Sequence, residues 1–543
     1  MNWNLLSKKE PKTNEEILSI LLKNRGITDK ESFLHPKDPI DLTLEDVGID
    51  KEQVNKAVER LKEALENKEK IIIFGDYDCD GVCATTVLWE TMHNIGFSVL
   101  PFIPDRKEHG YGLSTKALDE ILAKNKPSIL ISVDNGIVAE AQWQRLADVG
   151  VFTILTDHHE PEDKLPPADC IIHTTKLCGT TVAWMLAREL AKIPKSKIQA
   201  SKNIEDLLDL CAIATIADQV ILTDANRSFV KFGLEQLQKT RRIGLQLLIE
   251  AAGLKGKPVD TYAVNFAIAP RINAMGRLGN ALDALRALCT KDRSKAAVLI
   301  GKLHDTNITR QDLTTQMYEI ALAKRQTWKE ESVIIVASDQ FHEGVIGLIA
   351  SRLTEMFYKP SIVLAISGET AKGSARSVAG VHITNLLREV KSDLMEIGGH
   401  PMAAGLKLQT AQIEVFSQKL RQHAKNTIDV SLLTALIDVD SVLPTTLQTM
   451  EVAQGLTVMQ PFGPGNREPL FQMDKVKIDS AKIIGKEGKH LKLRTADCDL
   501  LWFGHGRELE HFSNSPTVSL IGHLQVNHWN GSKSLQIIVK DIH

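Results

Sequence analysis

Three groups of acidic and histidine side chains follow apolar segments in the first half of the chain. They are Asp76, Asp78 and Asp80 in GDYDCDG, Asp134 in VDNG, and Asp157, His158 and His159 in TDHH. An aspartate beside a glycine or an asparagine is also a common turn signal, so one such group alone would carry little weight. A turn requires one aspartate, however, and has no use for three at alternate positions or for a His-His pair. We therefore interpret the three groups together as one chemical site.

These side chains are suited to binding hard divalent cations. Alternate positions on an extended segment point to one side, which would place Asp76, Asp78 and Asp80 together. Carboxylates gathered in one place repel one another unless cations lie between them. Oxygen-rich ligand sets with one or two imidazoles favour Mn²⁺ or Mg²⁺ over Zn²⁺ or copper. A fourth candidate is Asp218, which ends the apolar helix predicted at ATIADQV and would otherwise be buried without a partner.

The segments that carry these groups alternate between predicted strands and predicted helices. Apolar strands at residues 71–74, 129–133 and 151–155 are separated by amphipathic helices. This pattern predicts an α/β fold, a doubly wound parallel sheet with crossover helices. In such sheets ligands collect at the carboxyl ends of the strands, which is where the acidic groups lie.

The same kind of pattern divides the chain into five parts. We predict a polar, helical N-terminal extension (1–68), the α/β domain with the acidic groups (69–225), a mostly helical connector (226–330), a second, smaller α/β domain (331–425) and an OB-like β-barrel (430–543). The barrel prediction rests on several short strands separated by polar turns.

Composition excludes several classes of protein. The 543 residues are 43% hydrophobic and 24% charged with a net charge of −3, which is typical of a globular protein with several cores. No apolar run approaches the ~18 residues of a membrane span, and the N-terminus lacks the apolar core of a signal peptide. The seven cysteines include no CxxC pair. We therefore expect a cytoplasmic protein with reduced thiols and no membrane contact.

Phosphate-binding candidates lie further along the chain. Arginine suits this role because its planar guanidinium matches phosphate oxygens. The candidates are Arg271, Asn273 and Arg277 in APRINAMGRLG, Arg310 in a predicted connecting helix, Ser374 and Arg376 in GSARS, and Gly399 and His400 in GGHPMAAG. The glycines of the last two segments also suit plain turns. The alternative function for GGHP is to begin a helix whose N-terminus binds an anion.

The predicted barrel has a basic segment. Residues 475–494 contain seven lysines and arginines and two acidic residues, and the barrel offers the aromatic residues Phe462, Phe471, Trp502 and Phe503. Basic grooves with stacking aromatics bind single-stranded nucleic acid. A solvated lysine-rich face with aromatics in the core explains the same pattern, and both interpretations stay open.

The motifs GDYDCDG, VDNG, TDHH and ATIADQV, in this order, resemble those of the DHH phosphoesterase superfamily. APRINAMGRLG, GSARS, GGHPMAAG and the C-terminal barrel resemble the RecJ single-strand-specific exonucleases within it, from about residue 70 to the end. The resemblance implies that two Mn²⁺ or Mg²⁺ ions are held by Asp78, Asp80, Asp134, His158 and Asp218, with Asp76 supporting or ligating. It also implies that His159 binds the scissile phosphate or assists the leaving group, so Asp76 and His159 are the catalytic candidates.

This sequence departs from the superfamily at one position. Many DHH phosphoesterases carry a ligand histidine four residues before the position of Asp78, and here that residue is Phe74. We expect one ion to be bound more weakly, or its coordination to be completed by Asp76 or by water.

The resemblance implies a monomeric, metal-dependent exonuclease that degrades single-stranded DNA in the 5′→3′ direction to 5′-mononucleotides, in DNA repair and recombination. A single-strand-binding protein or a helicase would be its candidate protein partner. The alternatives are a phosphodiesterase for short oligonucleotides or cyclic dinucleotides, a pyrophosphatase, and a catalytically silent scaffold in a replication complex. The barrel favours a polymeric substrate, and the retained carboxylates argue against a silent scaffold.

Overall fold

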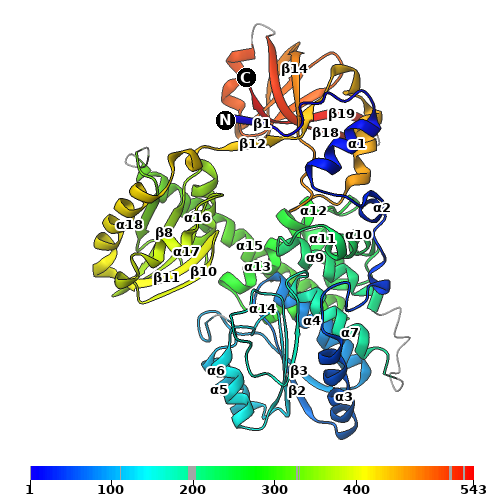
Figure 1. The fold of residues 1–543 in the computed structure, drawn as a ribbon, viewed down its shortest axis with the longest axis vertical. Helices are drawn as coiled ribbons and strands as arrows, with labels where there is room; N and C mark the ends of the chain where they lie inside the picture. The colour runs from blue at the N-terminus through cyan, green and yellow to red at the C-terminus, as the bar shows by residue number, and fades with distance from the viewer. Residues whose placement is uncertain are drawn as a thin grey trace. The chain divides into compact units, whose positions relative to one another are not determined.

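The computed structural model describes residues 2–110, 112–193, 204–325, 328, 330–512, 516–529 and 532–543. The chain forms two compact units, a larger one of residues Leu5–His304 and Asp438–His543 and a smaller one built mainly from Asp305–Ile437. Figure 1 shows the elements of both units. Within the described residues, no helix is both long enough and apolar enough to cross a lipid bilayer.

The larger unit contains a five-stranded parallel sheet. Its strands, in the order β3-β2-β4-β5-β6, are β3 (Ser98–Phe102), β2 (Lys70–Phe74), β4 (Ile129–Val133), β5 (Phe152–Asp157) and β6 (Cys170–His173). Helices α3 (Lys51–Asn67), α4 (Cys79–Ile95) and α7 (Gly179–Leu190) cover one face, and α5 (Thr115–Lys124) and α6 (Glu140–Asp148) cover the other. The predicted doubly wound α/β fold is therefore confirmed.

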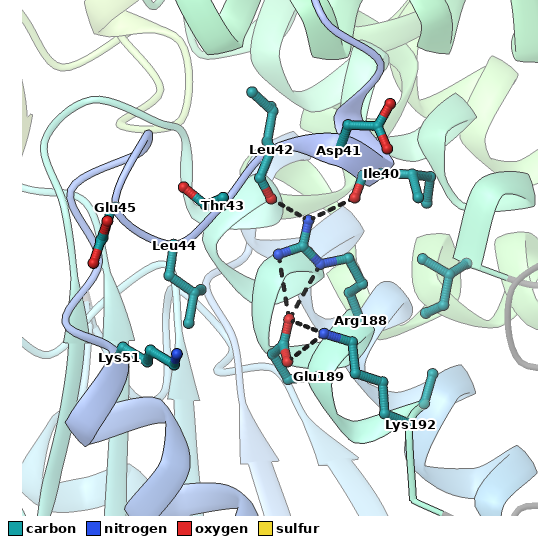
Figure 2. A pocket seen from close by; sticks show the side chains of 12 residues that line it. Ile40, Asp41, Leu42, Thr43, Leu44, Glu45, Lys51, Arg188, Glu189 and Lys192 are labelled. Carbon is teal, nitrogen blue, oxygen red and sulfur yellow. Dashed lines mark hydrogen bonds and ion pairs between the residues drawn. The ribbon is translucent and has the colours of Figure 1, made fainter.

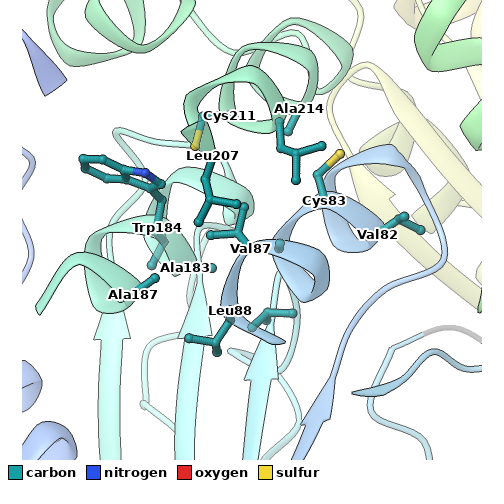
Figure 3. Close-up of a cluster of buried hydrophobic side chains, with 14 of the residues drawn as sticks. Val82, Cys83, Val87, Leu88, Ala183, Trp184, Ala187, Leu207, Cys211 and Ala214 are labelled. Carbon is teal, nitrogen blue, oxygen red and sulfur yellow. The ribbon is translucent and has the colours of Figure 1, made fainter. Parts of the chain in front are cut away.

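Burial on both faces explains why the strands are apolar throughout. Ile71 and Ile73 of β2 pack into the core with α4 and α7, whereas Ile72 and Phe74 pack into the core with α5 and α6. Figure 3 shows the first of these cores, where α4 meets α7 and α9 (Leu208–Ala217) through small side chains such as Cys83. This close packing fixes the positions of the N-termini of α4 and α7.

A helical region that includes the predicted connector (226–330) follows the sheet. It comprises α9, α10 (Asp224–Gln238), α11 (Ile243–Ala251), α12 (Thr261–Ala263), the π-turn η2 (Val264–Ile268), α13 (Ala269–Leu278), α14 (Ala281–Cys289) and α15 (Arg293–Leu322). The largely buried Arg242 before α11 donates to both carboxylate oxygens of Glu90 in α4, at 2.7 and 2.9 Å. This contact anchors the helical region to the α/β core.

The C-terminal part of the larger unit is a seven-stranded sheet. Its order is β13 (Ser441–Val442), β14 (Phe471–Lys477), β18 (Thr517–Trp529), β19 (Ser532–Ile542), β17 (Asp499–Trp502), β16 (His490–Arg494) and β15 (Ser480–Ile484). The predicted OB-like β-domain is present, but among the described strands the pairing runs from β13 to β15 without closing into a barrel.

Most of the proposed stacking aromatics of this domain belong to its core. Phe471 and Trp502 are buried, and Phe462 packs against the same cluster, so the core interpretation is correct for these three. Phe503 alone of the four is more than half exposed, at 52%.

The N-terminal extension contributes to both halves of the larger unit. Helices α1 (Asn14–Asn24) and α2 (Lys30–Leu34) place Ile17, Leu21 and Phe33 in the core of the C-terminal domain, whereas α3 packs on the α/β core. The loop before α3 is held by Arg188 of α7, which donates to the carbonyls of Ile40 and Leu42 beside a cavity of about 640 Å³ (Figure 2). None of the predicted site residues lines this cavity.

A buried arginine joins the α/β core to the C-terminal domain. The guanidinium of Arg227 in α10 lies 3.9 Å from the ring centroid of Phe33 and donates to the carbonyls of Phe33, Met459 and Gln460. Burial lowers the pKa of Arg227 to about 10, so it remains charged at neutral pH. A further backbone bond joins Leu222 N to Pro464 O at 2.7 Å.

The smaller unit is a second α/β domain, as predicted. Its sheet has the order β10 (Glu396–His400), β11 (Ala403–Gln409), β9 (Thr370–Arg376), β8 (Ser361–Ser367) and β7 (Ile334–Ser338), and only β7 and β8 are parallel. Helix α16 (Ile346–Phe357) packs into one core, and α17 (Ile383–Arg388) and α18 (Ile413–Thr427) pack into the other.

Two expectations for this domain are wrong. GSARS is part of strand β9 rather than a turn, and GGHPMAAG forms the β10–β11 hairpin rather than the start of a helix. Close packing explains Gly373 and Gly399. A Cβ at Gly373 would lie 2.6 Å from the Leu364 side chain, and one at Gly399 would lie 2.4 Å from the Ala403 carbonyl oxygen.

Candidate metal centre

The loop from β2 to α4 brings the first acidic group together by capping a helix. Asp78 is the N-cap of α4, and its carboxylate accepts a hydrogen bond from Gly81 N at 3.0 Å. Asp80 lies in the first turn of this helix. The prediction that residues 76–80 form one extended segment is therefore wrong. The helix begins within this segment because aspartate is a favourable N-cap. A Cβ at Gly81 would lie 2.6 Å from the Asp76 backbone, so the loop folds back tightly on the helix.

Asp80 is held by the N-terminus of α7. Its two carboxylate oxygens accept hydrogen bonds from Gly179 N at 2.7 Å and Thr180 N at 2.8 Å. The positive end of the helix dipole stabilises a negative charge in this position. Gly179 has no space for a side chain, because a Cβ there would lie 2.4 Å from Oδ1 of Asp134.

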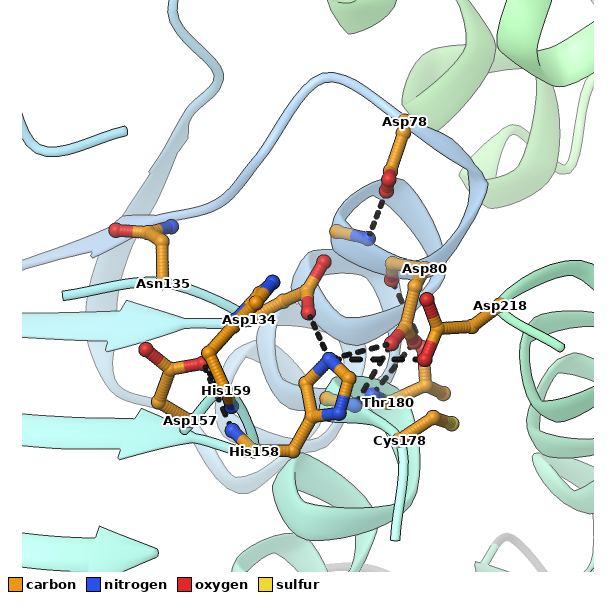
Figure 4. A network of polar contacts seen from close by, with 12 residues as sticks. Asp78, Asp80, Asp134, Asn135, Asp157, His158, His159, Cys178, Thr180 and Asp218 are labelled. Carbon is orange, nitrogen blue, oxygen red and sulfur yellow. Dashed lines mark hydrogen bonds and ion pairs between the residues drawn. The ribbon is translucent and has the colours of Figure 1, made fainter. Parts of the chain in front are cut away.

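His158 lies at the centre of the cluster (Figure 4). Its Nε2 is 3.2 Å from Oδ1 of Asp134, 3.6 Å from Oδ2 of Asp218 and 3.8 Å from Oδ2 of Asp80. Asp134 follows β4 with a φ of 61°, a left-handed conformation that is costly for a residue with a side chain. Asp218 is the C-cap residue of α9, as predicted. The structure thus brings all six predicted ligands into one place.

The six predicted ligands fall into two groups, and within each group the ligand atoms lie within 4.8 Å of one another. One group is Asp76, Asp78 and Asp134, and the other is Asp80, His158 and Asp218. A third group contains Asp134, His158 and His159, and it shares Asp134 with the first group and His158 with the second.

The electrostatics of the cluster fit divalent cations. Burial, together with the charge of Asp78, raises the pKa of Asp76 to about 8, and burial with the charge of Asp80 raises that of Asp218 to about 8. Burial also raises the pKa of Asp134 well above its ordinary value and lowers that of His158, which favours a neutral, ligating imidazole. Oδ1 of Asp134 and Nε2 of His158 are buried with no hydrogen-bond partner in the described chain. A bound cation would satisfy both atoms.

His159 is held by an aspartate to which the sequence analysis assigned no role. Its Nδ1 lies 2.7 Å from Oδ1 of Asp157, which also accepts from the His158 backbone N–H, while Oδ2 accepts from Ile137 N. Burial opposes protonation of His159, but the contact with Asp157 outweighs it and raises the pKa of the imidazole to about 9. The contact with Asp157 thus favours the protonated form of His159, whose side chain is 32% exposed.

Helix α13 supports the acidic loop. Oδ1 of Asn273 accepts a hydrogen bond from Cys79 N at 2.8 Å, and a Cβ at Gly276 would lie 2.3 Å from Tyr77 O. The glycine thus lets the backbone of the acidic loop approach α13 closely. Arg271 donates to the carbonyls of Ala251 and Ala267.

Two arginines lie close to Tyr77 of the acidic loop. Burial raises the pKa of Tyr77 to about 12, and the charges of Arg106 and Arg277 oppose this rise. The Arg106 guanidinium lies 5.6 Å from the ring centroid of Tyr77. The sequence analysis did not identify Arg106 as a candidate, although it lies in the loop after β3, at the same edge of the sheet.

Phe74 is fully buried and stacks on Phe102, with ring centroids 5.6 Å apart.

The remaining candidates belong to the smaller unit. In β9, Nη1 of Arg376 donates to Oγ of Ser374 at 3.1 Å and to the Ala375 carbonyl at 2.8 Å. Both Ser374 and Arg376 face the first turn of α16, since a Cβ at Gly347 would lie 3.2 Å from Ser374 Oγ and 3.1 Å from Arg376 Nη2. Gly399 and His400 end β10 and are exposed. Arg310 lies in α15 and donates to Oδ1 of Asn307.

Three protein-family models match the chain. They are the DHH family N-terminal domain at residues 70–215, the DHHA1 domain at 330–426 and the RecJ OB domain at 439–541. The single-stranded-DNA-specific exonuclease RecJ of Thermus thermophilus is 34% identical, with 90% of this chain and 71% of the relative aligned. The chain belongs to the RecJ family. The RecJ exonuclease of Bacillus subtilis is 33% identical over 97% of this chain and 67% of its own length.

Solved RecJ structures agree with the fold. The crystal structure of T. thermophilus RecJ with Mn²⁺ superposes with a TM-score of 0.84 at 30% identity, covering 100% of this chain and 79% of that one. The structure of the same protein with Mg²⁺ gives 0.78 at 28% identity, covering 100% and 78%. The resemblance to the DHH superfamily and to RecJ is therefore confirmed.

We expect Mn²⁺ to raise the melting temperature of this RecJ-family protein more strongly as the pH rises from about 5 to about 8. In this range the folded carboxyls of Asp76 and Asp218, with pKa values of about 8, hold protons that the unfolded chain has released. The metal-free protein therefore loses stability with rising pH, whereas a bound cation favours the ionised carboxylates. Thermal unfolding with and without saturating Mn²⁺ measures the difference.

Asp134→Asn is the matched variant for this measurement, because it keeps the size of the side chain and removes one charge. It should reduce the Mn²⁺-dependent shift and should melt above the wild type at about pH 8 without metal. A shift that is independent of pH and equal in both proteins would contradict the assignment of these carboxylates.

Proposed function

We propose that this chain is a metal-dependent exonuclease that hydrolyses single-stranded DNA from the 5′ end and releases 5′-mononucleotides. The observation that carries the proposal is the largely buried cluster of five aspartates and His158 at the carboxyl edge of the sheet. Relatives named as single-stranded-DNA-specific exonucleases align with 90% or more of the chain, which supports the substrate class.

The cluster would hold two ions, Mn²⁺ or Mg²⁺, one in each of the two ligand groups. Such ions supply an activated water and stabilise negative charge on a phosphodiester. Asp134 belongs to the first group, and its Oδ1 lies 3.2 Å from Nε2 of His158 in the second group, so the two groups adjoin. The N-termini of α4 and α7 hold Asp78 and Asp80 in place through backbone N–H donors.

His159 supplies a positive charge and a proton donor at the edge of the cluster. Because its Nδ1 faces Asp157, its Nε2–H is the donor left for the scissile phosphate or for the leaving oxygen. Arg106 and Arg277, whose charges both act on Tyr77, add positive charge for the neighbouring phosphates.

The C-terminal domain would bind the strand away from the metal centre. Its segment 475–494 carries seven basic residues, of which Lys489 and Lys492 form ion pairs with Glu487 and Asp499. The exposed Phe503 offers one ring beside His490, with centroids 5.2 Å apart. This combination supports salt-dependent binding of single strands.

With Mn²⁺, the purified protein should release mononucleotides from single-stranded DNA labelled at either end, in the order expected for attack at the 5′ end. Asp134→Asn should lower the rate of hydrolysis by about a hundredfold or more, as expected when a group that stabilises the transition state or holds a metal ion is removed. Binding of the strand should persist. Strands of both sugars and a duplex complete the assay. Attack from the 3′ end, or near-normal hydrolysis by the variant at saturating Mn²⁺, would refute the proposal.

We further propose that Ser374, Arg376 and the first turn of α16 bind the 5′-phosphate of the substrate, which gives the enzyme its end specificity. Burial lowers the pKa of Arg376, and none of its contacts within the described chain is to a carboxylate. A partly buried guanidinium without a carboxylate is suited to an incoming anion. Helix α16 provides backbone donors at the same place.

Arg376→Ala should reduce kcat/KM on 5′-phosphorylated strands by about tenfold to a hundredfold, which corresponds to the loss of one charge-assisted hydrogen bond. The same substitution should reduce kcat/KM on 5′-hydroxyl strands much less. Lys372→Ala is the control, since Lys372 is exposed on the same strand and pairs with Glu343. Equal losses on both kinds of end, or no loss, would remove Arg376 from the proposed pocket.

A further inference from the structure

Two exposed aromatic rings lie side by side in the larger unit. Tyr262 is 69% exposed and Phe266 is 66% exposed, and their ring centroids are 4.6 Å apart with a tilt of 35°. Large aromatic side chains are usually mostly buried. Among the described tyrosines, phenylalanines and tryptophans, only Phe503 of the C-terminal domain is exposed to a similar degree. The packing of the core therefore gives no reason for this pair.

The pair is tied to the metal centre through two contacts. Tyr262 lies in α12 and Phe266 in the π-turn η2, which continues into α13, the helix that packs on the acidic loop. Asn265, next to Phe266, accepts a hydrogen bond from the Gln219 side chain at 2.8 Å, and Gln219 directly follows Asp218. π-Turns are rare and occur frequently at functional sites.

The surroundings of the rings favour a polyanion. Lys255 and Lys257 precede the rings and Arg271 and Arg277 follow them, whereas the acidic residues nearby are Asp260 and Glu250, which pairs with Lys255 at 2.7 Å. The loop that begins at Asp218 continues to Leu222, whose N–H donates to Pro464 of the C-terminal domain. The rings thus border the segment that joins the metal centre to the domain with the basic strands.

A nucleobase fits the rings better than a protein partner does. The residues beside them, Asp260, Thr261 and Asn265, are polar, whereas a stable protein interface needs a broad surface with an apolar centre. A base offers a flat π-face to an aromatic ring whatever its sequence, and its phosphate complements the nearby basic charge. In a duplex these faces are covered by neighbouring bases, so the rings would select unpaired strands.

We propose that Tyr262 and Phe266 form a stacking platform for bases of the single strand as it approaches the metal centre. This inference rests on the proposed exonuclease function and adds the residues that position the strand. The rings are assigned to binding and not to the hydrolytic step, because Phe266 has no polar group and stacking uses the ring face of Tyr262 rather than its hydroxyl.

The first test compares Tyr262→Ala/Phe266→Ala with the wild type on long single-stranded DNA. Removal of the rings should raise KM by about tenfold, as expected for lost base stacking, and leave kcat within about twofold. Tyr262→Leu/Phe266→Leu keeps the apolar area and should be similarly impaired. Val298→Ala changes a 74% exposed residue of α15 and should behave as the wild type.

The second test places one abasic nucleotide at successive positions from the 5′ end. In the wild type, KM should rise at one or two positions, and in the alanine variant this rise should disappear because the ring that met the base is gone. Unchanged KM in the alanine variant, full activity of the leucine variant, or abasic effects equal in both proteins would overturn the stacking proposal. Absence of hydrolysis by the wild type would instead refute the proposed exonuclease function.

Discussion

Repulsion among buried carboxylates at one edge of a parallel sheet is the constraint on which this site depends. Asp76, Asp134 and Asp218 all have raised pKa values because they are withdrawn from water and lie near further aspartates. A fold that gathers such charges is destabilised unless cations compensate them. The backbone donors at the starts of α4 and α7 hold two of the carboxylates, and the remaining unsatisfied atoms face the centre of the cluster.

The helices around the cluster approach the acidic loop and Asp134 closely. Gly81, Gly179 and Gly276 each lie where a Cβ would come within 2.6 Å of the acidic loop or of Asp134. Small residues between α4, α7 and α9 bring the helix N-termini to the sheet edge, and Arg227 fixes the C-terminal domain to the same body. The metal centre and the domain with the basic strands are thus parts of one packed unit.

The sequence predicted the elements and the gathering of the acidic residues and His158 well, because both follow from local rules. Strand-end positions identified Asp134 and His158, and an apolar helix identified Asp218. The reasons for Asp78 and Asp80 were wrong, since helix capping replaced the expected extended segment. The role of Asp157, the position of Arg106 and the hairpin at Gly399 depend on which segments meet in three dimensions. Periodicity along the chain carries no such information.

The most direct test of the account is anomalous X-ray scattering at the manganese edge from crystals of the protein grown with Mn²⁺. We expect two manganese peaks at the carboxyl edge of the sheet, one among Asp76, Asp78 and Asp134 and the other among Asp80, His158 and Asp218. A diffraction map with no manganese at this edge, or with manganese only elsewhere on the protein, would contradict the claim that the carboxylate cluster is a metal centre.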